Sequence, residues 1–174
     1  IFSTYQNNPN NLYTSLAYVN VLIGQGKIDK ALEVLNRLKN IYPLNTVVSL
    51  SIAEILIENN LNLEYAERLL EPLEKHYSLN PNYLRVSSKL YTLKKNKFKA
   101  AISRSSYYEL LDDVGLALEV LSNTIRSNEI NIEQKQMLEA KKLNIICGNP
   151  RPLEPLFGEK TCNYQPSLTL PEPF

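Results

Sequence analysis

The chain contains no tryptophan, one methionine, one histidine and only five glycines among its 174 residues. The scarcity of glycine argues against a glycine-rich loop that cradles a phosphate group. The single histidine, His76, has no second histidine with which to form a zinc site of the HExxH kind. Apolar runs such as Val47–Val48 and Ile55–Ile57 are far shorter than the roughly 18 residues that a membrane-spanning helix needs. These features argue against nucleotide-binding, zinc-hydrolase and transmembrane classes.

The charge of the chain is nearly balanced, with 19 Lys and Arg residues against 18 Asp and Glu residues and a formal net charge of +1. No global field therefore favours nucleic acid or a membrane surface as the partner. Apolar residues make up 44% of the chain and charged residues 21%, which is typical of a folded domain with a sizeable core. The sequence begins at Ile1 without an initiator methionine or a leader, so we expect it to be a piece of a longer precursor.

Side chains suited to catalysis are not grouped in any recognisable pattern. Neither Cys147 nor Cys162 has a plausible general base within its own segment. The carboxylates are scattered at positions that we expect to face solvent on helices, and we expect His76 to be solvated near a helix C-terminus. We therefore expect no enzymatic activity, no catalytic residue, no cofactor and no metal site in this chain.

The N-terminal part of the chain divides into two amphipathic helices. The first is predicted over residues 12–25 and ends at Gly26, because glycine adopts the left-handed conformation without steric cost. The second is predicted to begin near Asp29 and to stop before Pro43. A small residue at the turn, then Ala31, then Pro43 follow at the spacing of a tetratricopeptide repeat, in which the alanine lies where two helices cross closely.

The same pattern returns along the chain at intervals of roughly 34 residues. Ala66 and Ala100 occupy the crossing position of the next two helix pairs. Ala117 lies in the first helix of the fourth pair, where we also expect it to be buried at a helix crossing. The pattern predicts an all-α, tetratricopeptide-like, right-handed helical solenoid of about four helix pairs over residues 1–147. Pro72 lies inside one predicted helix and lacks a backbone donor, so we expect a kink there or a late helix start. The further helices are predicted over 46–58 (with Asn45 as its cap), 63–77, 82–94, 97–111, 114–126 and 132–146.

Residues 148–174 differ in composition from the rest, because they hold six of the ten prolines. Such a segment cannot continue the helices, so we expect a Pro-rich, extended C-terminal tail as a second unit. Apolar side chains such as Leu156 and Phe157 favour a tail that packs along the last helices, and a loose tail is the alternative.

The third and fourth helix pairs carry a resemblance that is more specific than the repeat pattern. It is carried by Arg104-x-x-Tyr107-Tyr108 on one helix, an Asp112-Asp113-Val114-Gly115 turn, and Ala117-Leu118 on the next helix. This arrangement is similar to the C-terminal repeats of periplasmic zinc metalloproteases of the β-barrel assembly-enhancing protease type. That family continues with a last helix rich in Gln, Ala and Lys or Arg, and residues 133–144 look like it.

The resemblance implies a two-part protein, with an HExxH protease domain upstream and this chain as its non-catalytic, protein-binding domain. The implied role is to dock the protease on the outer-membrane β-barrel assembly machinery or on its substrates, in the periplasm. The alternative is a free-standing tetratricopeptide adaptor or secretion chaperone with no protease attached.

In tetratricopeptide repeats the first helix of each pair lines a concave face that binds the partner. The corresponding positions predict a partner-binding groove that includes Tyr13, Asn20, Glu54, Arg85 and Lys89. Asn20 stands where such proteins bond the backbone of a bound peptide, and a role in solubility alone is the alternative.

A basic segment extends from Tyr77 to Tyr108, where no acidic residue occurs. A patch of this kind attracts an acidic loop, a phosphate-bearing lipid or nucleic acid. The alternative is a solvated face whose charge is balanced by acids on neighbouring helices. Nucleic acid is disfavoured, because Tyr107 and Tyr108 match family positions that pack between helices and do not form exposed stacking platforms. The predicted basic patch consists of Lys94, Lys95, Lys97, Lys99 and Arg104.

The periplasmic location that the resemblance implies gives the two cysteines a reason to pair. A disulfide between Cys147 and Cys162 would close a loop of about 15 residues, for which a chain-entropy estimate gives around 3 kcal/mol. It would clip the tail onto the last helix. Two unrelated reduced thiols are the alternative.

Overall fold

Helices build the part of the chain that this computed structural model describes, residues 2–148, and no strand occurs in that range. The predicted all-α class is therefore confirmed for these residues. The tail beyond residue 148, with Cys162, lies outside the described residues. The elements are α1 (Phe2–Asn7), α2 (Leu12–Gly24), α3 (Ile28–Ile41), α4 (Thr46–Glu58), α5 (Leu63–Leu70), the 3-10 segment η1 (Glu71–Leu73), α6 (Glu74–Tyr77), α7 (Pro81–Leu93), α8 (Lys97–Leu110), α9 (Val114–Ile125) and α10 (Ile132–Gly148).

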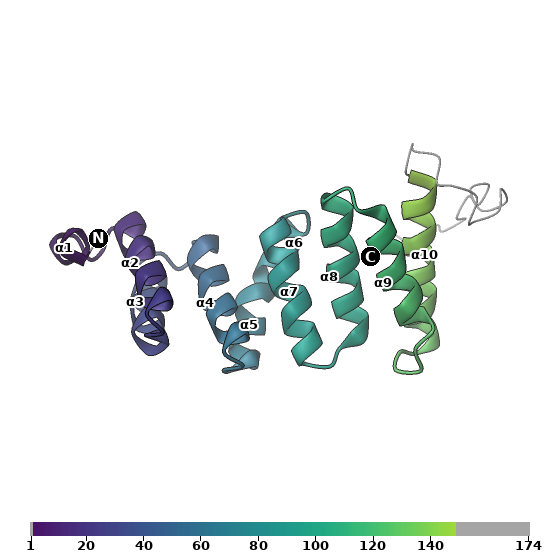
Figure 1. Ribbon diagram of the computed structural model, residues 1–174, viewed down its shortest axis with the longest axis horizontal. Helices are drawn as coiled ribbons and strands as arrows, with labels where there is room; N and C mark the ends of the chain where they lie inside the picture. Colours follow the sequence, from purple (N-terminus) through teal and green to yellow (C-terminus); the bar gives the residue numbers. More distant parts are fainter. Residues whose placement is uncertain (1, 149–174) are drawn as a thin grey trace, which may run out of the picture.

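The helices stand side by side in chain order along the long axis of the molecule, from α1 at one end to α10 at the other (Figure 1). Helices that are neighbours in the sequence pack against each other, as α2 does with α3, α4 with α5, and α8 with both α7 and α9. α4 also packs against α7, although α5, η1 and α6 lie between them in the sequence. This contact places α4 and α7 next to each other on one face, where the candidate site lies.

Asparagine and aspartate side chains cap the N-termini of most of these helices. Each accepts a hydrogen bond from the backbone N–H three residues further on, at 3.0–3.1 Å. The bond satisfies a donor that the first helical turn leaves without a partner. Asn45 was predicted to cap its helix, and this is confirmed. The caps are Asn11, Asn45, Asn62, Asn80, Asn96 and Asp113.

One type of turn follows α2, α4, α7 and α8. In each turn a residue with positive φ is followed by an N–H that bonds the carbonyl five residues back, as Lys27 does with Leu22 at 2.9 Å. Gly26 has a φ of 70°, which confirms the left-handed conformation predicted for it. The other three turns place a non-glycine residue in this conformation, namely Asn60, Lys95 and Asp112.

Pro72 interrupts the helix that was predicted over residues 63–77. α5 ends at Leu70, the proline lies in the 3-10 segment η1, and a short helix, α6, follows. The α-helix is therefore interrupted where a kink or a late helix start was expected, because a proline ring and its missing N–H are incompatible with a continuous α-helix.

The alanines predicted at helix crossings are buried. Ala31, Ala66 and Ala117 have no exposed surface, and Ala100 is 9% exposed. The predicted burial of these four positions is therefore confirmed.

The apolar core is divided into two clusters. The N-terminal cluster extends from Val19 to Leu90, and the C-terminal cluster extends from Ala101 to Ile145. α7 and α8 pack against each other and bury four serine side chains in addition to apolar ones. We call these buried serines the serine seam; they are Ser87, Ser88, Ser103 and Ser105.

Burial raises the pKa of Tyr83, on α7, from 10.0 to about 12. The Tyr83 hydroxyl loses its proton near pH 10 in the unfolded chain and only near pH 12 in the folded chain. The contribution of neutral Tyr83 to the free energy of unfolding is therefore fully present below pH 10 and falls as the pH rises towards 12. We expect Tyr83→Phe to remove this fall, which amounts to at most about 1.4 kcal/mol per pH unit. Urea unfolding at pH 9, 10 and 11 measures the slope, with Tyr13→Phe as the exposed control. Equal slopes in the parent and Tyr83→Phe would contradict the assignment.

Candidate partner-binding groove

A line of hollows follows one face of the molecule over α4, α7 and α9. The first hollow lies between the N-terminal halves of α4 and α7, and Val47, Leu50 and Arg85 are among its lining residues. The second lies between the C-terminal ends of the same helices and is bordered by Lys89 and by Arg104 of α8. The hollows therefore continue along a shared boundary between α4 and α7.

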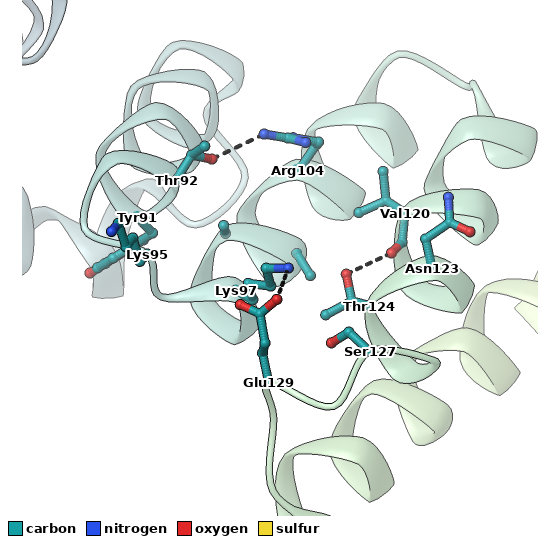
Figure 2. A pocket seen from close by; sticks show the side chains of 12 residues that line it. Tyr91, Thr92, Lys95, Lys97, Arg104, Val120, Asn123, Thr124, Ser127 and Glu129 are labelled. Atoms are coloured by element: carbon teal, nitrogen blue, oxygen red, sulfur yellow. Dashed lines mark hydrogen bonds and ion pairs between the residues drawn. The ribbon is translucent and has the colours of Figure 1, made fainter.

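A third hollow, of about 480 Å³, lies between α7 and α9 over the N-terminal half of α8. We call it the Arg104 cleft. Figure 2 shows Arg104 reaching towards Thr92, with Val120, Asn123 and Thr124 of α9 across from α7 and α8. Arg104 also borders the second hollow and a further hollow against α9. The guanidinium group therefore occupies the junction of three hollows.

Two ion pairs connect α4 with α7 within the first two hollows. Arg85 Nη2 lies 2.5 Å from Glu54 Oε1, and Lys89 Nζ lies 3.0 Å from Glu58 Oε1. Both pairs join residues 31 positions apart, which is possible because α4 and α7 lie side by side. The half-exposed pairs contribute little to stability, but they neutralise the cations of this part of the groove.

The predicted groove residues are divided between two places. Glu54, Arg85 and Lys89 border the hollows between α4 and α7. Tyr13 and Asn20 lie on α2, outside these hollows, and Tyr13 is 80% exposed. The structure thus brings the α4 and α7 positions together but leaves the α2 positions as exposed side chains beyond the hollows.

The residues of the predicted basic patch do not share one environment. Lys94 pairs with Glu64 and Glu67 of α5, and the hydrogen bond that Lys94 donates to Glu67 is the main reason that the pKa of Lys94 is raised. Lys97 pairs with Glu129. Lys99 lies 4.9 Å from the centre of the Tyr91 ring. Lys95, Lys97 and Arg104 border the Arg104 cleft, and Lys94 and Lys99 are not among its lining residues.

Arg104 is held by hydroxyl groups of α7. Its Nη2 donates to Thr92 Oγ1 at 3.0 Å and its Nε lies 3.3 Å from Ser88 Oγ. Thr92 Oγ1 in turn donates to the carbonyl of Ser88 at 2.7 Å, which leaves its lone pairs for the guanidinium. These neutral partners orient the side chain without cancelling its charge.

The groove also contains α9 residues that the sequence did not single out. Asn123 and Thr124 border the Arg104 cleft, and Thr124 Oγ1 donates to the carbonyl of Val120 at 2.8 Å. The repeat pattern indicates these positions as well, because α9 is the first helix of the fourth pair. It follows α8 in the chain as α7 follows α5 and α6. The predicted groove residues come only from the first three helix pairs.

No group of three or more His, Cys, Asp or Glu residues within 2–148 is placed to hold a metal ion. His76 is exposed and close to the C-terminal end of α6, as predicted. Cys147 is exposed near the end of α10, and its predicted partner Cys162 lies outside the described residues, so the disulfide stays a prediction. Over the described part of the chain, no helix has the length and apolar character to cross a membrane.

Comparison of the sequence with protein-family models and with curated proteins finds no match. The resemblance to the repeats of periplasmic metalloproteases therefore stays a prediction from the residues that carry it.

Proposed function

We propose that this chain is a non-catalytic, tetratricopeptide-like solenoid that binds an extended segment of another protein along the groove formed by α4, α7 and α9. The observation that carries the proposal is the line of hollows that meet at Arg104. An extended segment fits such a line, because its side chains enter successive hollows while its backbone follows the groove.

The recurrence of the same local devices supports the solenoid. The caps Asn11, Asn45, Asn80 and Asp113 follow one another at spacings close to the roughly 34 residues of a tetratricopeptide unit. The turns with positive φ after α2, α4 and α7 recur in the same way. Burial of small alanines at the crossings supports the close helix packing that this repeat type requires.

The two parts of the groove differ in chemistry, and this supports a partner segment with a defined direction. The hollow between the N-terminal halves of α4 and α7 presents Val47, which is 56% exposed, and the half-buried Leu50. The Arg104 cleft presents a cation and polar side chains. These two surfaces match a partner segment that has an apolar residue at one end and a polar or charged residue at the other.

A narrower proposal rests on the sequence resemblance alone. In it, the groove belongs to the docking domain of a periplasmic zinc metalloprotease, and its partner is the outer-membrane β-barrel assembly machinery or a substrate of it. A free-standing adaptor or secretion chaperone is the alternative. An HExxH helix encoded upstream in the same gene supports the first, and a gene without one contradicts it.

Site-directed photo-crosslinking tests whether the groove binds a protein. We expect a benzoyl-phenylalanine at Val47 and one at Asn123 to crosslink to the same segment of the same protein in the source cells. The same group at Asn36, exposed on α3, serves as the control and should not crosslink to it. Equal crosslinking from Asn36, or different partners from the two groove positions, would contradict binding along the groove.

A further inference from the structure

The Arg104 cleft contains more positive than negative charge. Lys95, Lys97 and Arg104 border it, whereas Glu129 is the carboxylate among its lining residues. Glu129 is already paired with Lys97. Among the ion pairs of residues 2–148, none gives a carboxylate partner to Lys95 or Arg104. The cleft therefore offers two cations to a negatively charged ligand.

The guanidinium of Arg104 is oriented before any ligand arrives. Thr92 and Ser88 occupy two of its five N–H donors, and the remaining donors are left for a bidentate contact. An arginine that is already held in place loses less side-chain entropy on binding than a freely rotating one. A carboxylate matches the fork of donors in two-point contacts, as a phosphate also does.

The shape of the cleft suits a peptide backbone. Ala100 and Ala101 of α8 and Val120 of α9 line it with small apolar side chains, over which an extended chain can lie closely. Because Arg104 also borders the neighbouring hollows, a segment that follows the groove from α4 to α9 passes its guanidinium.

We propose that the Arg104 cleft binds the carboxylate of an Asp or Glu side chain in the partner's extended segment, with Arg104 as the main contact and Lys95 as the second cation. The proposal rests on the proposed function and names the chemistry of its partner. A nucleic acid fits less well, because a phosphate chain would run along Glu54 and Glu58, whose ion pairs leave no net positive charge between α4 and α7.

The experiment uses a peptide selected on the full chain from a phage-displayed library of random ten-residue sequences. The tightest peptide is synthesised with a fluorescent label, together with a twin in which each Asp or Glu is changed to Asn or Gln. Affinities are measured by fluorescence anisotropy for the parent, Arg104→Gln, Arg104→Lys, Lys95→Gln and the control Lys30→Gln. Lys30 is an exposed cation of α3 outside the groove, so its variant has the same loss of charge.

We expect the acidic peptide to lose about tenfold or more in affinity with Arg104→Gln, less with Arg104→Lys and Lys95→Gln, and less than about twofold with Lys30→Gln. The amide twin should bind weakly, and its affinity should not change with Arg104→Gln. This result would show that the acidic side chain of the peptide contacts Arg104. Circular dichroism melts show whether each variant is folded. If Arg104→Gln does not fold, Arg104→Lys still tests the proposal.

Three outcomes would overturn the proposal. Equal binding of the acidic peptide and its twin would refute the carboxylate contact, while crosslinking from Val47 and Asn123 would leave the proposed function standing. Arg104-dependent binding of a ten-nucleotide oligouridylate that is tighter than that of the acidic peptide would indicate a phosphate ligand instead. If no peptide is selected and neither groove position crosslinks, the carboxylate site and the proposed function are both contradicted.

Discussion

Leu121→Ala should lower the free energy of unfolding by about 2–5 kcal/mol and should loosen α8, α9 and α10 more than the rest of the protein. Leu121 has no exposed surface and belongs to the C-terminal cluster. Removing its side chain leaves a cavity that a close-packed core fills only in part. The buried apolar residues of the described chain form two separate clusters, so we expect the damage to stay mostly within the cluster that contains Leu121.

Hydrogen exchange measured by mass spectrometry tests the division. We expect Leu121→Ala to lose amide protection in α8–α10 first, and Leu35→Ala, which is fully buried in the N-terminal cluster, to lose it first in α2–α5. The two losses of stability should add within about 0.5 kcal/mol in the double variant. An equal loss of protection over all helices in both variants would mean that the clusters form one cooperative core.

The sequence predicted the helices well because local devices and periodicity agree in this chain. Asn45 and Gly26 mark a start and an end by their own hydrogen-bonding and conformational preferences, which need no tertiary contact. The crossing alanines follow from the spacing of the pattern, and Ala31 and Ala66 are both fully buried. Such features are readable from a single sequence.

Helix α1 was not predicted, because its six residues are too few to show a periodicity. Contacts from distant residues hold it in place. Tyr5 stacks on Tyr18 with ring centroids 4.3 Å apart, and its hydroxyl lies 2.5 Å from Arg37 Nη2. An element that depends on partners more than ten residues away leaves no local signal.

The candidate site was predicted in part. The prediction lacked the ion pairs and hydrogen bonds that join side chains on different helices. The expectation that the first helix of each pair lines the groove selected Glu54, Arg85 and Lys89, which border the hollows. Their neutralisation by ion pairs was not predicted, since each pair joins residues 31 positions apart. Arg104 was placed in a basic patch by composition, but only the structure distinguishes its hydroxyl partners from the carboxylate partners of Lys94 and Lys97.

Ala66→Leu should lower the free energy of unfolding by about 1–3 kcal/mol, because the added atoms overfill a close contact of α5 with its neighbours. Ala66 has no exposed surface, and α5 packs against both α4 and α7. Leucine and alanine have similar helix propensities, so the expected loss comes from volume and not from the backbone. Since α4 and α7 form the groove, a larger residue at this position would also displace the helices that hold Glu54 and Arg85 together.

The matched control is Ala140→Leu, which adds the same atoms at an exposed position of α10 and should change stability by less than about 0.5 kcal/mol. Urea unfolding followed by circular dichroism gives both values. Equal stability of Ala66→Leu and Ala140→Leu would show that the contact at Ala66 has room for a larger side chain. The spacing of small residues would then reflect composition and not close helix packing, and the same doubt would apply to Ala31, which shares the position in the first helix pair.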